Sequence, residues 1–175
     1  MAKTLEEYVR TIPDFPKKGI MFRDVTTVIG DADGFQLAID EMTKLIGDTQ
    51  CDVIAGVESR GFIFGAPIAY NLGKPFVLVR KAGKLPCETV KQSYDLEYGQ
   101  ATIEMHKDSI KPGQKVVLID DLIATGGSIE AAARLVEELG GEVVKMVFLL
   151  ELAGLKARDR LSKYDIESCI IYPGA

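Results

Sequence analysis

The sequence is poor in the side chains that usually bind metals or form cross-links. Its 175 residues include one histidine, three cysteines and no tryptophan. The cysteines, Cys51, Cys87 and Cys169, are odd in number and far apart, which argues against a disulfide framework or a cysteine metal site and favours a reducing compartment. The histidine, His106, falls on a predicted strand, so we expect a structural role for it.

Positive charge and long apolar runs are also scarce. Lysine and arginine number 21 against 26 aspartates and glutamates, a net charge of −5, and no basic run exceeds a few residues. This balance argues against a nucleic-acid partner. No apolar stretch is long enough to cross a bilayer, and residues 1–7 lack the apolar core of a signal peptide. We therefore expect a cytoplasmic protein without a membrane partner.

Two common phosphate-binding motifs are absent. The sequence has no P-loop, since no glycine is followed after four residues by Gly-Lys-Ser or Gly-Lys-Thr, and it has no Gly-x-Gly-x-x-Gly motif. Their absence argues against an ATPase and against a nicotinamide-dependent enzyme.

The segment 116–128, Val-Val-Leu-Ile-Asp-Asp-Leu-Ile-Ala-Thr-Gly-Gly-Ser, is the most informative stretch. Its apolar start predicts a buried strand, Asp120 and Asp121 stand at the carboxyl end of that strand, and Thr125–Ser128 precede a helical pattern. A helix start has unpaired N–H groups and partial positive charge, and glycines let an anion approach closely. We expect a phosphate there, beside carboxylates suited to sugar hydroxyls or a metal. An ordinary capped turn explains the glycines and hydroxyls but not the paired aspartates.

Two further stretches have residues that suit anionic groups. Gly56–Phe62 places small and polar residues between a predicted strand and a predicted helix, where Ser59 and Arg60 could bind a second phosphate. The alternative is that Ser59 caps the helix and Arg60 is solvated. The basic run Arg80–Lys84 follows another strand and is either a pyrophosphate contact or solvated surface charge. Two anion sites in one sheet suit a substrate with phosphate at both ends.

Helical and strand patterns alternate along the chain, which predicts one α/β domain over residues 1–175 with a mainly parallel sheet covered on both faces. Residues 14–30 and 82–98 are expected to be irregular because glycines, prolines and polar residues interrupt them. The predicted helices cover residues 5–12, 32–46, 60–72, 129–139 and 155–161. The predicted strands cover residues 52–57, 75–80, 100–106, 116–119, 143–150 and 166–172.

These motifs together resemble the type I phosphoribosyltransferases, and among them the adenine phosphoribosyltransferases. The resemblance covers essentially the whole chain, with the motifs in the family's order. It is carried by Asp14-Phe15-Pro16, Gly19, Phe22-Arg23-Asp24, Glu58–Phe62, Arg80-Lys81, Lys84-Leu85-Pro86, Tyr94, Leu96–Gly99 and Leu122–Gly127. It implies the family's fold, a mainly parallel twisted sheet flanked by helices, with a small N-terminal hood over about residues 1–30 and a mobile active-site loop over about residues 82–98.

The resemblance also implies an activity in purine salvage. The family transfers the 5-phosphoribosyl group of phosphoribosyl pyrophosphate (PRPP) to N9 of adenine, giving AMP and pyrophosphate. Mg²⁺ is the implied cofactor, held mainly through PRPP and water, with no protein ligand assigned. A homodimer is expected, with Arg80 reaching across its interface, and a non-proline cis peptide is expected at Glu58–Ser59.

Site residues carried over from the family fall into four groups. Asp120 and Asp121 are the candidate ribose ligands, and Glu97 is the candidate for proton handling on adenine. The implied 5′-phosphate ligands are Ala124, Thr125, Gly126, Gly127 and Ser128. The implied pyrophosphate ligands are Ser59, Arg60, Arg80, Lys81, Lys84 and Tyr98. The implied adenine-binding residues are Met21, Phe22, Arg23 and Leu152.

Several alternatives stay open at this point. Leu152 alone is equally well explained by core packing, and Glu97 by a surface position in a polar loop. The chain could act on orotate or xanthine instead of adenine. It could also be a regulator or a binding module that recognises PRPP without chemistry, although it shows no helix-turn-helix extension and no basic stripe.

Overall fold

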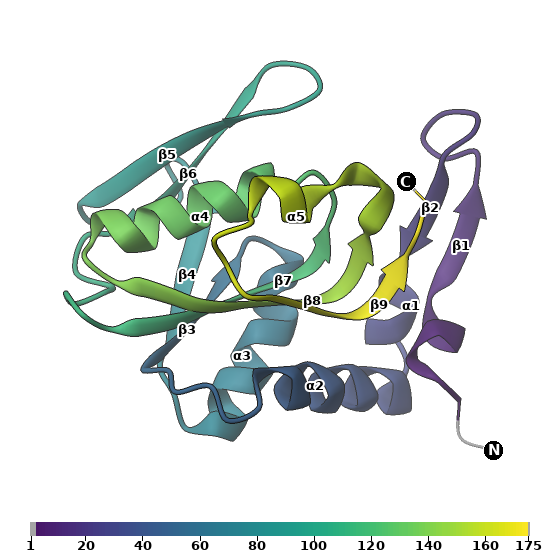
Figure 1. Cartoon of the computed structure of the whole chain (residues 1–175), viewed down its shortest axis with the longest axis horizontal. Helices are drawn as coiled ribbons and strands as arrows, with labels where there is room; N and C mark the ends of the chain where they lie inside the picture. Colours follow the sequence, from purple (N-terminus) through teal and green to yellow (C-terminus); the bar gives the residue numbers. More distant parts are fainter. Residues whose placement is uncertain (1–2, 175) are drawn as a thin grey trace.

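A computed structural model describes residues 3–174 (Figure 1). Its centre is a seven-stranded sheet with the order β5-β6-β4-β3-β7-β8-β9. Strands β4, β3, β7, β8 and β9 run parallel, and the β5–β6 hairpin joins β4 in antiparallel orientation. The bounds are β3 (Val53–Val57), β4 (Phe76–Lys81), β5 (Thr89–Asp95), β6 (Gln100–His106), β7 (Lys115–Ile123), β8 (Glu142–Leu152) and β9 (Ile166–Tyr172). The predicted α/β class and mainly parallel sheet are confirmed.

Helices cover both faces of this sheet, as Figure 1 shows. One face carries α2 (Ala32–Ile46) and α3 (Arg60–Leu72), and the other carries α4 (Gly127–Glu138) and α5 (Ala157–Arg160), which follows the 3₁₀ turn η2 (Ala153–Leu155). Strand β7 feeds both cores, because successive side chains of a strand point to opposite faces. Val116 and Leu118 pack toward α4, whereas Val117 and Ile119 pack toward α2 and α3. Two buried faces explain why the start of this strand is continuously apolar.

Within residues 3–174, no helix combines the length and the apolar character needed to cross a membrane.

The N-terminal region forms a small hood beside the β9 edge of the sheet (Figure 1). It consists of the 3₁₀ turn η1 (Leu5–Tyr8), the antiparallel pair β1 (Arg10–Pro13) and β2 (Met21–Asp24), and the single turn α1 (Thr26–Ile29). The predicted helix over residues 5–12 is therefore wrong beyond Tyr8, and residues 14–30 are not irregular throughout. A capping box between Thr4 and Glu7 closes only one turn. The following residues are extended because they pair with β2.

The predicted irregular loop over residues 82–98 is also wrong in part. Strand β5 occupies its second half and pairs with β6 residue by residue, from Thr89 opposite His106 to Asp95 opposite Gln100. Its side chains alternate between half-buried and exposed positions from Val90 onward. Only two of its half-buried residues, Val90 and Tyr94, have apolar bodies, so the alternation is too short to stand out in a search for apolar periodicity.

Most other bounds agree with the predictions to within two residues, and α2, α3, β6 and β9 match them fully. One difference matters for the site: β7 continues to Ile123 instead of ending at Ile119. Asp120 therefore still pairs with the neighbouring strand, at Phe148 of β8. The predicted helix over residues 155–161 is shorter, since α5 ends at Arg160.

The hood is tied together by Asp24, a buried carboxylate at the end of β2. It accepts hydrogen bonds from the Thr26 hydroxyl (2.6 Å), from the Arg10 guanidinium and from the Thr26 amide (2.9 Å). These donors lower the pKa of Asp24 from its ordinary value of 3.8 to about 2, the Thr26 hydroxyl contributing most. The ionised form is thus favoured in the folded state.

Replacing Asp24 with Asn should lower the free energy of unfolding at pH 7 by roughly 1–2 kcal/mol, because the Arg10 contact loses its charge. Since the folded pKa lies below the unfolded one, the contribution of Asp24 is fully present above about pH 4 and is lost as the pH falls toward about 2. Thermal unfolding followed by circular dichroism from pH 7 downward should show the two proteins converge. Asp108→Asn, at an exposed carboxylate, is the control. A gap that stays constant with pH would contradict this account.

Candidate functional site

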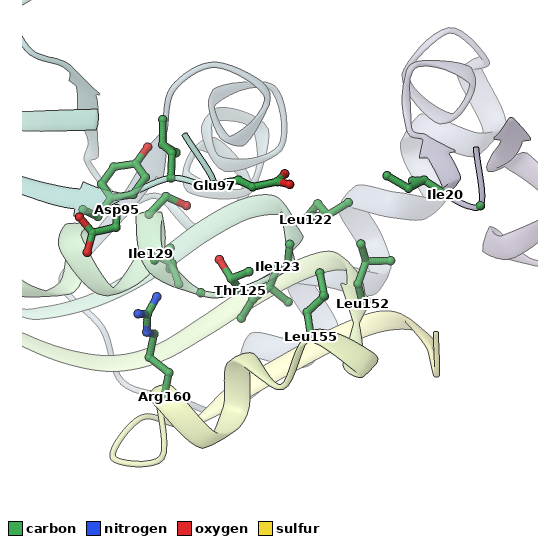
Figure 2. Close-up of a pocket in the computed structure, with 17 residues that line it drawn as sticks. Ile20, Asp95, Glu97, Leu122, Ile123, Thr125, Ile129, Leu152, Leu155 and Arg160 are labelled. Carbon is green, nitrogen blue, oxygen red and sulfur yellow. The ribbon is translucent and has the colours of Figure 1, made fainter. Parts of the chain in front are cut away.

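A cavity at the carboxyl ends of β7 and β8, here called the large pocket, is lined by residues of the motif (Figure 2). Its volume is about 880 Å³. All five residues of the loop 124–128 line it, together with Tyr94–Glu97 from the hairpin and Gly19 and Ile20 from the hood. Leu152 and Leu155 form an apolar side. The pocket therefore joins a polar loop to an apolar wall of a size that suits a flat base.

The loop 124–128 forms a backbone cradle at the start of α4. Gly126 has φ +83°, and no side chain caps the helix. A Cβ at Gly126 would lie 3.1 Å from Leu161 and 3.2 Å from Ala157, so the position has little room for any other residue. The first hydrogen bond into the helix runs from the Glu130 amide to the Gly126 carbonyl (3.0 Å), which leaves the preceding amides for an anion.

A smaller polar cavity of about 370 Å³, the carboxylate pocket, adjoins this loop. Asp120 and Asp121 line it, as do Ser59, Arg60 and Lys81. Ser128 lines both cavities. The two predicted anion sites therefore lie side by side, with the paired aspartates in the smaller cavity.

The two aspartates differ in their partners. Asp121 accepts a hydrogen bond from Nε of Arg60. Asp120 is buried, and its Oδ1 accepts one from the Asp121 amide (2.8 Å). Burial raises the pKa of Asp120 well above its ordinary value, the neighbouring Asp121 carboxylate raises it further, and Arg60 opposes the shift only weakly. Ionisation of Asp120 is therefore costly in this pocket.

Glu58 organises the turn that precedes α3. Its side chain accepts hydrogen bonds from the Lys81 amide (2.7 Å) and from Nη2 of Arg80 (3.0 Å). These contacts lower the pKa of Glu58, the Lys81 amide contributing most. The expected cis peptide at Glu58–Ser59 is present, and Phe15–Pro16 is also cis. The turn is thereby held against the end of β4.

The structure brings together only some of the predicted pyrophosphate ligands. Ser59, Arg60 and Lys81 line the carboxylate pocket, but Lys84 and Tyr98 line neither described cavity. Arg80 also lies outside both cavities, because its guanidinium is directed to Glu58. Tyr98 is 81% exposed at the end of the hairpin.

The predicted adenine-binding residues separate in the same way. Leu152 lines the large pocket, whereas Met21, Phe22 and Arg23 do not. Phe22 packs edge-on against Phe15 with 5.1 Å between ring centroids, and the Arg23 guanidinium lies 3.9 Å from the Tyr172 ring centroid. The hood contributes the preceding Gly19 and Ile20 instead.

Glu97 lies in the large pocket, where Figure 2 shows its carboxylate above the loop with Thr125. Its Oε1 accepts a hydrogen bond from Nζ of Lys17 in the hood (2.9 Å). Both side chains are mostly exposed, so this ion pair contributes little to stability. It nevertheless links the end of the hairpin to the hood across the pocket mouth.

Sequence reasoning missed several residues of the large pocket. Leu122 and Ile123 belong to the segment 116–128 and Ile129 follows it directly, so the apolar positions here were a usable signal. Arg160, Leu155 and Asp95 carry no local signal, because only the fold brings α5 and the hairpin to this loop. The residues of this pocket to which sequence reasoning gave no role are Gly19, Ile20, Asp95, Leu96, Leu122, Ile123, Ile129, Leu155 and Arg160.

Several known proteins are similar to this chain in sequence and in fold. The phosphoribosyl transferase domain family matches residues 28–173. The adenine phosphoribosyltransferase of Agathobacter rectalis is 73% identical, over 98% of this chain and 99% of the relative. A crystal structure of the enzyme from Thermoanaerobacter pseudethanolicus has a TM-score of 0.92 at 53% identity, covering 97% of this chain and 100% of that one. The Saccharomyces cerevisiae structure, in complex with adenine and an imino-altritol bisphosphate, has a TM-score of 0.88 at 40% identity, covering 94% and 96%.

Replacing Asp120 with Asn should stabilise the protein at pH 7 by about 0.5–2 kcal/mol, because it removes a buried charge while keeping an acceptor for the Asp121 amide. The folded pKa of Asp120 is raised, so ionisation costs stability as the pH rises above about 4, where the unfolded chain loses its proton. The gain should therefore shrink toward pH 4. Urea unfolding at pH 7 and pH 4 measures it.

Asp121→Asn is the matched control for this experiment. It removes the partner of Arg60 and should give no gain. An Asp120→Asn protein that is less stable than the wild type at pH 7 would show that the charge is balanced within the fold.

Proposed function

The chain belongs to the phosphoribosyltransferase family, and from this premise we infer that it is an enzyme of purine salvage. It transfers the 5-phosphoribosyl group of PRPP to N9 of adenine, giving AMP and pyrophosphate. Relatives named adenine phosphoribosyltransferases align with this chain over nearly its whole length. The geometric observation that carries the inference is that two cavities share Tyr94, Leu122 and Ser128 in their lining, one of them holding the loop 124–128 and the other the paired aspartates.

The two cavities suit the two ends of PRPP. We place the 5′-phosphate on the amides of the loop 124–128, where a helix start offers unpaired donors. The ribose hydroxyls lie at Asp120 and Asp121, and the pyrophosphate extends into the carboxylate pocket toward Arg60 and Lys81. Support for this placement comes from Ser128, which borders both cavities.

The charge at Asp120 suits the expected transition state. In our proposal the C1–O bond breaks ahead of bond formation, so positive charge develops on the ribose ring. A buried carboxylate without a full counter-charge stabilises such a cation more than a solvated one does. Because the fold holds Asp120 in place before the reaction, little reorganisation is needed.

The residues present fit magnesium only in a limited role. Oxygen ligands from Asp120 and Asp121 are of the type that Mg²⁺ prefers. Among the described residues, however, no group of three or more histidine, cysteine, aspartate or glutamate side chains could hold a metal ion. We therefore propose binding mainly through PRPP and water. When bound, the ion neutralises charge on the departing pyrophosphate.

Adenine is proposed to enter the apolar side of the large pocket, against Leu152 and beneath the hood. Ile20 lines the same space. Contacts of adenine with Met21, Phe22 and Arg23 stay a prediction. These residues do not line the large pocket, so the contacts require backbone groups or a shift of the hood. Glu97 stands at the pocket mouth and is proposed to handle the purine proton.

A homodimer is part of the proposal. Large apolar side chains are exposed on α3 and β4, with Tyr70 84% exposed and Ile63 and Leu78 more than one-third exposed. Such a surface suits burial against a second copy. In that assembly Arg80 would contribute to a neighbouring site, and the end of the β5–β6 hairpin with Tyr98 would close over bound PRPP.

Incubating the protein with PRPP, Mg²⁺ and one free base at a time tests the activity. Adenine should give AMP and pyrophosphate in equal amounts, while orotate, xanthine, hypoxanthine and guanine should give little nucleotide. Chromatography of the nucleotides and a coupled pyrophosphate assay measure the two products. Release of pyrophosphate with orotate or xanthine alone would reassign the substrate, and binding of PRPP without any nucleotide would indicate a non-catalytic module.

Replacing Glu97 with Ala should lower kcat about 100-fold, the scale of lost general acid–base catalysis, and change the KM for PRPP less than threefold. The substitution also breaks the ion pair to Lys17. Lys17→Met breaks the same ion pair and keeps the carboxylate, so it should retain most of the turnover. Steady-state kinetics with both substrates separates these effects. An unchanged kcat in Glu97→Ala would remove Glu97 from the mechanism.

A further inference from the structure

Arg160 is a charged residue of the large pocket that lies outside every motif. It stands at the end of α5, and it lines the cavity beside the loop 124–128. Among the described residues that line this cavity it is the only lysine or arginine, and the other charged ones are the acids Asp95 and Glu97. A cavity that accepts a phosphate therefore has a single cationic side chain, next to the backbone cradle.

The distance from Arg160 to the cradle is short. Its Nη1 lies 3.2 Å from the position that a Cβ on Gly127 would occupy. Figure 2 shows the side chain rising from α5 toward the segment that carries Thr125 and Ile129. The missing side chain of Gly127 thus makes room for a guanidinium as well as for an anion.

Packing fixes α5 against the same loop. Ala157 and Leu161 are buried, and both lie against Gly126, where a Cβ would come within 3.2 Å of either side chain. The backbone that carries Arg160 is therefore held in register with the cradle. A side chain placed in this way loses less conformational freedom when it binds a ligand.

The ion pair that Arg160 forms with Glu130 does not occupy all the N–H donors of the guanidinium. Its Nε lies 3.5 Å from Oε2 of Glu130, a weak contact in which the Arg160 side chain is 47% exposed. Glu130 is shared with Arg134, whose Nη2 donates to Oε1 at 3.0 Å. A guanidinium has five N–H donors, so most of those on Arg160 can face a ligand.

We propose that Arg160 is a binding residue for the 5′-phosphate of PRPP and AMP. It adds a charge-assisted contact to the neutral amides of the loop, and it offsets the repulsion of the nearby acids. This inference rests on the proposed placement of the 5′-phosphate at the cradle. With Arg160 in this role, α5 becomes part of the phosphate site and helps that site to distinguish phosphorylated from unphosphorylated ribose.

Arg160→Gln tests the proposal in the full-length protein. The dissociation constant of AMP and the KM for PRPP should each rise about tenfold, the usual loss for a charged hydrogen bond. The dissociation constant of pyrophosphate and the KM for adenine should stay within twofold, because their sites lie elsewhere. Isothermal titration with AMP and with pyrophosphate, and steady-state kinetics, provide these values. Unchanged AMP binding by Arg160→Gln would overturn the proposal.

Glu130→Gln is the matched control, since it breaks the same ion pair and leaves the cation at the cradle. AMP should bind this variant as tightly as the wild type or more tightly. An equal loss of AMP affinity in both variants would show that the ion pair only supports the helix packing. AMP binding by Glu130→Gln can be measured even if Arg160→Gln folds poorly. Formation of AMP by the wild-type protein is measured alongside, so that failure of the activity itself is distinguished from failure of the Arg160 assignment.

Discussion

The site depends on two adjacent carboxylates at the end of a strand whose faces are both buried. β7 continues through Asp120, so the backbone there is fixed by pairing with β8. That rigidity forces Asp120 to stay buried beside Asp121, which raises its pKa and makes its ionised form costly. Asp121 instead has an ion-pair partner in Arg60. The fold therefore holds one carboxyl in a place where its ionised form is costly, at the point where the proposed reaction develops a positive charge.

Topology explains why the second anion site lies beside these carboxylates. β3 and β7 are parallel neighbours, with Gly56 opposite Ile119, so the turns that follow them leave the sheet at the same edge. Gly61 completes the arrangement, because a Cβ there would lie 2.9 Å from the Ile119 carbonyl and 3.0 Å from Oδ1 of Asp120. The close approach of α3 to β7 is what lets Arg60 reach Asp121.

Local sequence patterns were sufficient to predict those parts of the fold in which the residue types themselves indicate a buried face, an exposed face or a turn. The bounds of α2 follow from its apolar spacing, and the loop 124–128 follows from glycines and hydroxyls after a buried strand. β5 was missed because only two of its half-buried residues, Val90 and Tyr94, have apolar bodies. The hood was misjudged because β1 and β2 are short strands that pair only with each other, in a two-stranded sheet. Arg160 could not be assigned, since nothing near it in the sequence indicates that α5 packs on Gly126. Sequence reasoning thus predicted the strand–turn–helix motifs better than the elements that pack around them.

The distribution of charge explains how an acidic protein can hold a highly anionic substrate. The chain has a net charge of −5, and five acids, Glu58, Asp95, Glu97, Asp120 and Asp121, line the two cavities. Carboxylates that stabilise a ribose cation also repel phosphates, so the attraction has to come from groups that do not neutralise them. Backbone amides meet this requirement because they bind an anion without adding a formal charge. Three cations line the two cavities: Arg60, which is paired with Asp121, Lys81 in the same carboxylate pocket, and Arg160, which approaches the cradle from α5. A cluster of lysines at the centre would bind the substrate more tightly but would destabilise the developing cation, which is the opposite of what catalysis requires.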